Sequence, residues 1–210
     1  MYNLYLVQVV DSYGPNKFLP LAISYQWMYA QTDARIKYNW NVADVLIEKL
    51  PIKDYVAGMT PPDAVAMSCY VWNWEYNRKL AQQIKSVFPN CKIIVGGPHI
   101  DKRDTEFFEK YPEFDIAVMG EGEKAFKEIL SRWPHLDFDN IPHVFPKGGE
   151  LCKLPSRLDE VDIVPSPILE GFYDDIFKMY KNRVPKNAMW QVTYETMRGC
   201  PYHCAFCDIG

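Results

Sequence analysis

Apolar runs of strand length alternate with amphipathic stretches along the first 133 residues. In 123–133, for example, Phe126, Ile129 and Leu130 recur at the three- and four-residue steps of a helix. Repeated strand–helix units of this length predict an α/β protein with a doubly wound, parallel sheet. Strands are predicted at 2–10, 64–71, 91–95 and 116–119, and helices at 19–30, 41–50, 75–88, 104–111 and 123–133.

The alternation ends after residue 133, where prolines become frequent. The tetrapeptide Lys147-Gly148-Gly149-Glu150 predicts a hairpin turn between 141–145 and 151–154. We interpret 134–186 as a linker with a hairpin, which wraps around the first domain without a core of its own.

A further strand is predicted from Met189 to Thr196, and it runs directly into Arg198-Gly199-Cys200. No helix follows it to complete a strand–helix unit. We therefore expect residues 187–210 to be the start of a second domain that is cut short.

Composition and charge narrow the class of protein. Of the 210 residues, 48% are hydrophobic and 24% charged, which supports a packed core and excludes wholesale disorder. The net charge of −4 argues against a nucleic-acid-binding surface as the main role. No apolar run approaches the roughly 20 residues that span a bilayer, and Met1-Tyr2-Asn3-Leu4 carries no basic leader. We expect a cytoplasmic protein with neither nucleic acid nor membrane as a partner.

The most informative motif is Cys200-x-x-x-Cys204-x-x-Cys207. Three thiolates at this spacing on one loop can hold three irons of a [4Fe–4S] cluster and leave the fourth iron open to a small molecule. Zinc is the main competitor, but a structural zinc site takes four ligands, and His203 adjoins Cys204 too closely to serve easily as the fourth. The other cysteines, Cys69, Cys91 and Cys152, are interpreted as buried apolar residues.

Two glycine turns each follow a predicted strand: Gly96-Gly97-Pro98-His99 and Gly120-Glu121-Gly122-Glu123. In an open α/β sheet, ligands bind beyond the carboxyl ends of the strands, and glycine lets the backbone approach them closely. Glu121 and Glu123 stand where a phosphate would otherwise dock at a helix N-terminus. The turns therefore favour a neutral, amide-rich ligand, with tight connections of no binding role as the alternative.

Residues 195–208, Glu-Thr-Met-Arg-Gly-Cys-Pro-Tyr-His-Cys-Ala-Phe-Cys-Asp, resemble the signature of radical S-adenosylmethionine enzymes. The resemblance implies that Cys200, Cys204 and Cys207 hold a [4Fe–4S] cluster that chelates S-adenosylmethionine, and that Phe206 lies near the adenine. It also implies one-electron cleavage to a 5′-deoxyadenosyl radical, with electrons from a flavodoxin- or ferredoxin-type donor and a small molecule or peptide as the substrate. Glu195 and Arg198 are interpreted as a salt bridge that steadies the loop, in preference to a direct substrate role.

Together with this motif, the glycine turns resemble the flavodoxin-like cobalamin-binding domain that precedes many radical S-adenosylmethionine barrels. Two further segments match this domain. Residues 18–22 follow the first strand, and residues 68–74 cover the end of the strand at 64–71 and the turn after it. The cobalamin contacts that the resemblance implies are Ser68, Val71, Trp72, Asn73, Gly96, Gly97, Pro98, His99, Gly120, Glu121 and Gly122.

The chain departs from one pattern of cobalamin proteins, D-x-H-x-x-G, whose histidine ligates cobalt. It has Asp11-Ser12-Tyr13-Gly14 after the first strand. His99 lies elsewhere and is interpreted as a hydrogen-bonding loop residue. The implied state is base-off cobalamin without a histidine ligand.

These observations combine into one prediction. Residues 1–133 form a cobalamin-binding domain, 134–186 a linker, and 187–210 the first strand and cluster loop of a truncated radical S-adenosylmethionine barrel. The implied function is radical chemistry with cobalamin, with methyl transfer to an unactivated carbon favoured over cyclisation or ring rearrangement. We do not expect this chain alone to cleave S-adenosylmethionine at enzymatic rates. The alternatives are a non-catalytic cobalamin-binding module and a receiver-like signalling domain, which lacks the expected acidic pocket.

Overall fold

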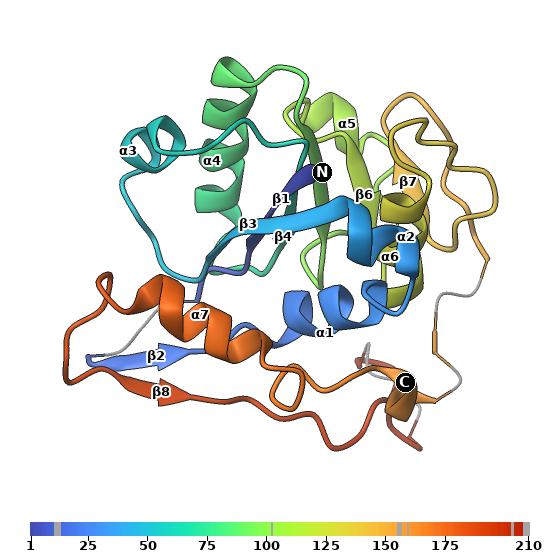
Figure 1. The fold of residues 1–210 in the computed structure, drawn as a ribbon. Coiled ribbons are helices and arrows are strands. Elements are labelled where there is room, and N and C mark those ends of the chain that lie inside the picture. The colour runs from blue at the N-terminus through green and yellow to red at the C-terminus, as the bar shows by residue number, and fades with distance from the viewer. Residues whose placement is uncertain (11–13, 102, 155–156, 159, 203, 208–210) are drawn as a thin grey trace.

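A six-stranded sheet lies at the centre of the computed structural model, which describes residues 1–10, 14–101, 103–154, 157–158, 160–202 and 204–207 (Figure 1). The strand order is β3-β1-β4-β5-β6-β7. The first five are parallel, and β7 pairs antiparallel with β6. Numbered along the chain, the parallel strands follow the 2-1-3-4-5 order of flavodoxin-like folds, so the predicted fold class is confirmed. The strands are β1 (Tyr2–Val7), β3 (Trp40–Leu46), β4 (Ala64–Ser68), β5 (Lys92–Gly96), β6 (Ile116–Val118) and β7 (Val144–Pro146).

Helices cover both faces of the sheet because each strand alternates its apolar side chains between two cores. On β1, Leu4 and Leu6 face one core while Tyr5 and Val7 face the other. The first core is covered by α1 (Leu21–Ala30), α2 (Ala34–Asn39) and α6 (Glu123–Ser131), and the second by α3 (Ile52–Ala57), α4 (Trp74–Val87) and α5 (Phe107–Lys110). The sheet is therefore doubly wound, as the alternating pattern predicted.

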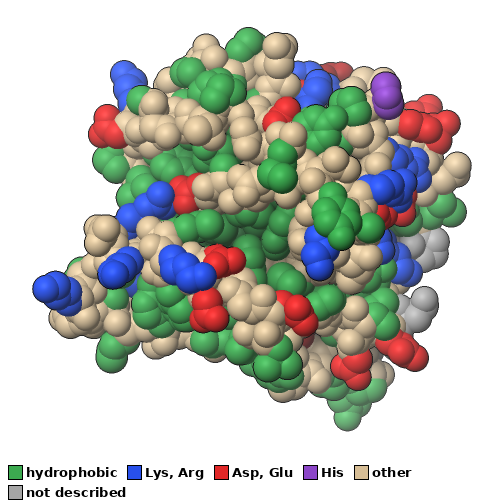
Figure 2. All heavy atoms as spheres, in the orientation of Figure 1, with side chains coloured by type: hydrophobic (Ala, Val, Ile, Leu, Met, Phe, Trp, Pro, Cys, Tyr) green, Lys and Arg blue, Asp and Glu red, His purple; other side chains and the backbone are tan. Residues whose placement is uncertain are grey.

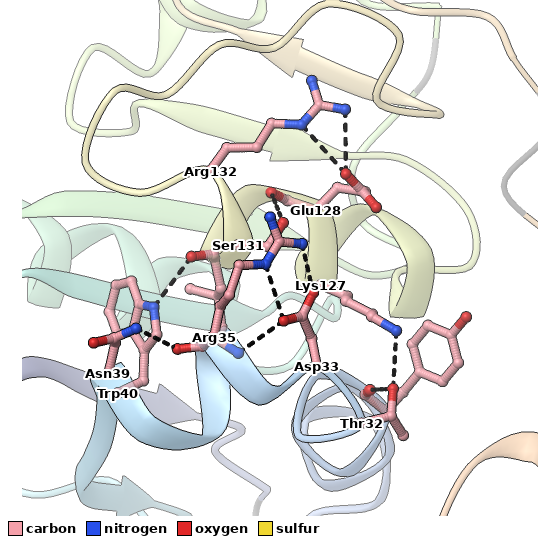
Figure 3. A network of polar contacts seen from close by, with 11 residues as sticks. Thr32, Asp33, Arg35, Asn39, Trp40, Lys127, Glu128, Ser131 and Arg132 are labelled. Carbon is pink, nitrogen blue, oxygen red and sulfur yellow. Dashed lines mark hydrogen bonds and ion pairs between the residues drawn. The ribbon is translucent and has the colours of Figure 1, made fainter.

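Polar contacts hold α2 and the start of β3 against α6 (Figure 3). The Asp33 carboxylate caps α2 by accepting from the backbone N–H of Arg35 at 2.9 Å. The indole of Trp40 donates to the carbonyl of Leu130 at 3.1 Å, and Lys127 donates to the hydroxyl of Thr32 at 2.9 Å. These contacts seat α1 and α6 side by side, and both helices point their first turns toward the site described below.

The helix predicted at 41–50 is wrong, because residues 40–46 form strand β3. Val45, Leu46 and Leu50 suggested one helical face, but Val45 and Leu46 face opposite cores. Strand β3 also buries Asp44, whose carboxylate binds Arg183 at 2.9 Å and accepts from the Tyr55 hydroxyl at 3.1 Å.

Residues of the predicted linker pack into the first core, with Ile141, Val144 and Phe172 among its buried members. The linker contains η1 (Val161–Ile163) and α7 (Phe172–Tyr180), and the turn at 147–150 joins β7 to a segment whose Cys152 bonds back to Val144 and His143. The strand predicted at 189–196 is shorter, β8 (Met189–Gln191), and pairs in parallel with β2 (Asn16–Phe18) in a separate two-stranded sheet. The short elements β2, α2, α3, η1 and α7 were not predicted.

Positive and negative side chains are interspersed over the face seen in Figure 2. That face carries no broad basic surface of the kind that binds nucleic acid. None of the described helices combines the length and apolar character needed to cross a membrane.

Replacing Tyr180 by Phe should lower the free energy of unfolding by about 1–3 kcal/mol, because two buried backbone groups lose their partner. The Tyr180 hydroxyl donates to the carbonyl of Val45 at 2.9 Å and accepts from the N–H of Ile47 at 3.0 Å, on the outer edge of β3. Urea unfolding at an unchanged slope would measure the loss.

The matched control is Tyr38→Phe, since the Tyr38 side chain is 74% exposed and the change should stay within about 0.5 kcal/mol. Equal midpoints for both variants would show that α7 does not depend on the Tyr180 hydroxyl to dock on the sheet.

Candidate functional site

A cavity of about 560 Å³ opens at the carboxyl edge of the parallel strands. Parallel strands present all their carboxyl ends at one edge, so the turns after β4, β5 and β6 meet there. The other walls are the first turns of α1 and the segment 195–199. Of the residues predicted to contact cobalamin, the cavity is lined by Ser68, Gly97, Pro98, Gly120, Glu121 and Gly122.

A narrower cleft continues from the cavity along the sheet. It shares Gln26, Gly97, Gly120 and Gly122 with the larger cavity and reaches Phe126 on α6. Gly96, at the end of β5, lines this cleft. The cleft runs between the sheet and the helices α1 and α6, and its volume of about 20 Å³ means that α1 and α6 would have to move off the sheet to admit an extended group.

Four other predicted contact residues line neither the cavity nor the cleft, and two of them have clear structural roles. Asn73 is fully buried, and its amide accepts from the N–H of Tyr70 and donates to the carbonyls of Ser68 and Val9. The backbone N–H of His99 donates to the carbonyl of Cys69 at 3.2 Å, while its ring lies 4.7 Å from that of Trp74.

The remaining two, Val71 and Trp72, are exposed beside the cavity. Val71 is 77% exposed, and Trp72 stacks on Tyr70 with ring centroids 4.5 Å apart. Since Tyr70 itself lines the cavity, this stacked pair forms an aromatic wall at its rim.

The glycines of the two turns meet different requirements. Gly97 has a φ of +110°, and a Cβ there would lie 2.6 Å from the carbonyl oxygen of Cys69, so the fold itself needs glycine. Gly122 has a φ of −98°, which any residue adopts, and its nearest neighbour would be the flexible Gln26 amide. A side chain at Gly122 therefore intrudes on the site without breaking the backbone.

The sequence-based reasoning missed Tyr25 and Gln26, which extend the cavity wall along α1 from Leu21 and Ala22. Burial raises the pKa of the Tyr25 phenol, and the nearby Tyr194 and Glu195 raise it further. The signal was present: positions 21, 22, 25 and 26 form one stripe of a helix that follows the first strand. Such a stripe must face the carboxyl edge of the sheet.

Arg198 joins the cysteine loop to the cavity wall. Its guanidinium contacts three carboxylates: Glu195 at 2.8 Å, Glu123 at 2.6 Å and Glu121 at 3.5 Å. Burial alone lowers the pKa of Arg198, but Glu123 and Glu195 outweigh that effect and raise it. The predicted Glu195–Arg198 salt bridge is confirmed, and the contacts to Glu121 and Glu123 extend it to the turn after β6.

The cysteines fall into three classes of burial. Cys69 and Cys91 are buried, as predicted, and Cys200 is half-buried. The prediction that Cys152 is buried is wrong: it is half-buried, because its segment lies beside β7 at the edge of the sheet. Cys204 and Cys207 are exposed, and the N–H of Cys207 bonds to the carbonyl of Cys204 in a turn. Phe206, between them, is 93% exposed.

Within the described part of the chain, no three His, Cys, Asp or Glu side chains converge as a metal-binding group. The three loop thiols are free and supply the soft donors that an iron–sulfur cluster requires, although they do not meet at one point. His203, the motif residue Asp208 and the sequence 11–13 lie outside the described residues.

Comparison with known proteins identifies a domain that contains the turns after β4, β5 and β6. Residues 37–130 match the family model described as the B12 binding domain. The chain is 36% identical over 198 residues to the cobalamin-dependent radical SAM methyltransferase TokK of Streptomyces tokunonensis. It is 35% identical over 202 residues to the 2-(S-pantetheinyl)-carbapenam-3-carboxylate methyltransferase of Streptantibioticus cattleyicolor.

Both alignments cover 92% of this chain but 29% of the relative, so the chain spans less than a third of those proteins. An uncharacterized methyltransferase of Pyrococcus horikoshii is 27% identical over 96% of this chain and 42% of its own length. The similarity thus covers most of the chain.

A thiol reagent should label Cys204 and Cys207 rapidly in the folded, metal-free chain, and Cys69 and Cys91 slower by a factor on the order of 100 or more. Burial raises the pKa of the Cys69 and Cys91 thiols to about 12, so raising the pH from 7 to 9 leaves both protonated. Mass spectrometry of labelled peptides would measure each rate.

Labelling in denaturant is the control, since all six thiols are free and should then react at similar rates. Rapid labelling of Cys69 in the folded chain would show that the turn after β4 opens to solvent.

Proposed function

We propose that this chain, which contains a B12-binding domain at residues 37–130, binds cobalamin in the cavity at the carboxyl edge of its sheet and forms the cofactor-binding part of a radical S-adenosylmethionine methyltransferase. One observation carries the proposal. The turns after β4, β5 and β6, all within the matched domain, meet at a single cavity whose other walls are the first turns of α1 and the segment leading into the three-cysteine loop.

The cavity suits the rim of a corrin ring, which is lined with neutral amides. Ser68, Gln26 and the backbone of the glycine turns offer neutral donors and acceptors, and Tyr25 and Tyr70 supply apolar surface. The acidic groups nearby are engaged elsewhere: Glu123 binds Arg198, and Glu121 also accepts from the N–H of Leu158 at 3.2 Å. Arg198, the cation in the described lining, is itself paired with three carboxylates, so the cavity favours a neutral ligand over a phosphate.

Within this proposal, Gly97, Gly120 and Gly122 bring the backbone against the ring, and the nucleotide tail would widen the narrow cleft of about 20 Å³ between α1, α6 and the sheet. The His99 ring packs on Trp74 and leaves the cobalt without a histidine from that turn. Trp72, stacked on Tyr70, covers apolar parts of the ring. Bound cobalamin would supply a cobalt centre able to carry a methyl group.

We assign Cys200, Cys204 and Cys207 to a [4Fe–4S] cluster, on the chemistry of their donor set. Because Cys204 and Cys207 are exposed on a turn, their loop can close around the cluster without opening the sheet. Phe206 would then cover the adenine of S-adenosylmethionine. The cluster and S-adenosylmethionine together would supply a carbon radical, with electrons from a flavodoxin- or ferredoxin-type donor.

The names of the two relatives at 35–36% identity favour methyl transfer over cyclisation or ring rearrangement, and we propose an unactivated carbon as the acceptor. The substrate, a small molecule or a peptide, would approach from the side of the cysteine loop. A non-catalytic cobalamin-binding module is the second candidate, favoured by the exposure of Cys204 and Cys207 in this chain.

The 210-residue chain should bind hydroxocobalamin, and Gly122→Val should weaken binding about tenfold or more by pushing Gln26 into the cavity. The bound spectrum should be that of a base-off form. Absorption titration would give both the affinity and the spectrum, and His99→Ala should leave the spectrum unchanged.

Gly58→Val is the matched control, because a Cβ at Gly58 makes only ordinary contacts at 3.6 Å on the surface helix α3, far from the cavity lining. Absence of binding by the unaltered chain would refute cobalamin binding, and a spectral change in His99→Ala would refute the histidine-free state.

Anaerobic reconstitution should load about four irons per chain, with broad visible charge-transfer absorption, as thiolate-held [4Fe–4S] clusters do. Cys204→Ala should abolish loading, since two thiolates cannot hold the cluster. Cys152→Ala is the control, because that thiol is remote from the motif in sequence and should be dispensable. Uptake of one zinc in place of iron would contradict the assignment.

A further inference from the structure

The closest contact between the cysteine loop and the cavity wall is a cluster of charges around Arg198. Two of its three carboxylate partners, Glu121 and Glu123, belong to the turn after β6, about 75 positions earlier in the chain. The third, Glu195, lies on the same segment as Arg198. Cys200, the first cysteine of the motif, is two residues further on.

This cluster is shielded from water. The side chains of Arg198 and Glu123 are 13% and 6% exposed. The nitrogens of the Arg198 guanidinium fork toward three different carboxylates, and charge-assisted contacts at that burial are strong and directional. Loss of either Arg198 or Glu123 would leave a charge in a poorly solvated position. A flexible surface ion pair would not have this consequence.

A second arginine holds the same segment. Arg157 donates to the backbone carbonyl of Arg198 at 3.1 Å and contacts Glu121 at 3.5 Å. Gly199 follows with a φ of +84°, and a Cβ there would collide with the Arg157 guanidinium. The backbone that enters the cysteine loop is thus held by two arginines, Arg198 within the segment and Arg157 of the linker.

The turn that carries Glu121 and Glu123 also lines the cavity with Gly120 and Gly122. Any ligand that packs against those glycines restrains the same few residues that hold Arg198. Conversely, release of Arg198 frees the turn on which the ligand would sit. The turn at 120–123 and its contacts with Arg198 therefore link the cavity to the cysteine loop.

We propose that Arg198 is a positioning residue that couples occupation of the cavity to ordering of the cysteine loop. Cobalamin bound against Gly120–Gly122 holds Glu121 and Glu123 in place, and these carboxylates hold the backbone that leads into Cys200. Coupling of this kind is reciprocal, so weakening the cluster of charges must also weaken cobalamin binding. The inference rests on the proposed function because it takes the cavity as the cobalamin site.

Hydrogen–deuterium exchange of peptides covering 195–202, in the 210-residue chain with and without hydroxocobalamin, tests the coupling. In the unaltered chain, cobalamin should slow exchange about fivefold or more. Arg198→Gln and Glu123→Gln should each abolish that slowing and raise the dissociation constant for hydroxocobalamin by a similar factor. Arg198→Lys keeps the charge but not the fork, and its effect should be intermediate.

The matched control is Arg78→Gln, which also deprives a buried carboxylate, Glu113 at 4% exposure, of its arginine. Arg78 and Glu113 line no part of the cavity. This variant should keep both the affinity and the cobalamin-dependent slowing, even if it unfolds more easily. A merely structural role for Arg198 predicts instead that both arginine variants behave alike.

Two failures can be told apart. If hydroxocobalamin binds Arg198→Gln and Glu123→Gln as tightly as the unaltered chain and still slows exchange at 195–202, the coupling is refuted while cobalamin binding stands. If the unaltered chain binds no hydroxocobalamin, the proposed function fails first. Glu123→Gln keeps the size of its side chain, so it provides the test if Arg198→Gln does not fold.

Discussion

Parallel pairing of β1, β4, β5 and β6 is the constraint on which the rest of this structure depends. Parallel strands place all their carboxyl ends at one edge, and the connections between them must cross the faces as helices. The turns after β4, β5 and β6, far apart in the chain, therefore gather around one cavity. Antiparallel pairing would have sent alternate turns to opposite edges and divided the site.

The glutamates of the turn after β6 illustrate how one feature can serve two purposes. At the N-terminus of α6, the helix dipole favours Glu123, and both Glu121 and Glu123 disfavour a phosphate at that position. In the folded chain their carboxylates also bind Arg198 from the segment before the cysteines. The same charges that point to a neutral ligand thus attach the cysteine loop to the cavity wall.

The linker contributes more to stability than its composition suggests. Strand β3 lies at the edge of the sheet, where free backbone groups would otherwise invite pairing with another chain. Tyr180 of α7 satisfies Val45 and Ile47 on that edge, and Arg183 neutralises Asp44 beside them. A segment without a core of its own can therefore complete the core of its neighbour.

Much of the fold could be predicted from local patterns, because alternation, helical spacing and glycine turns reflect interactions between residues close in sequence. The strands at 64–71, 91–95 and 116–119, the long helices and the gathering of the glycine turns at one edge all follow from such patterns. The errors came where a distant residue decided the outcome. Val45, Leu46 and Leu50 fit one helical face, but pairing of 40–46 with β1 makes a strand whose Val45 and Leu46 face opposite cores.

For the candidate site too, local patterns indicated some of the residues, and tertiary contacts decided the rest. The amino-acid sequence by itself indicated which residues to assign to cluster binding and cobalamin binding, namely the three-cysteine motif and the two glycine turns. It also indicated the salt bridge between Glu195 and Arg198. Only the tertiary structure decided that Asn73 is occupied in holding its own loop, that Tyr25 and Gln26 line the cavity, and that Arg198 reaches Glu121 and Glu123. The physical reason is that burial and ion pairing depend on which segments meet across the sheet edge, and no local pattern specifies those meetings.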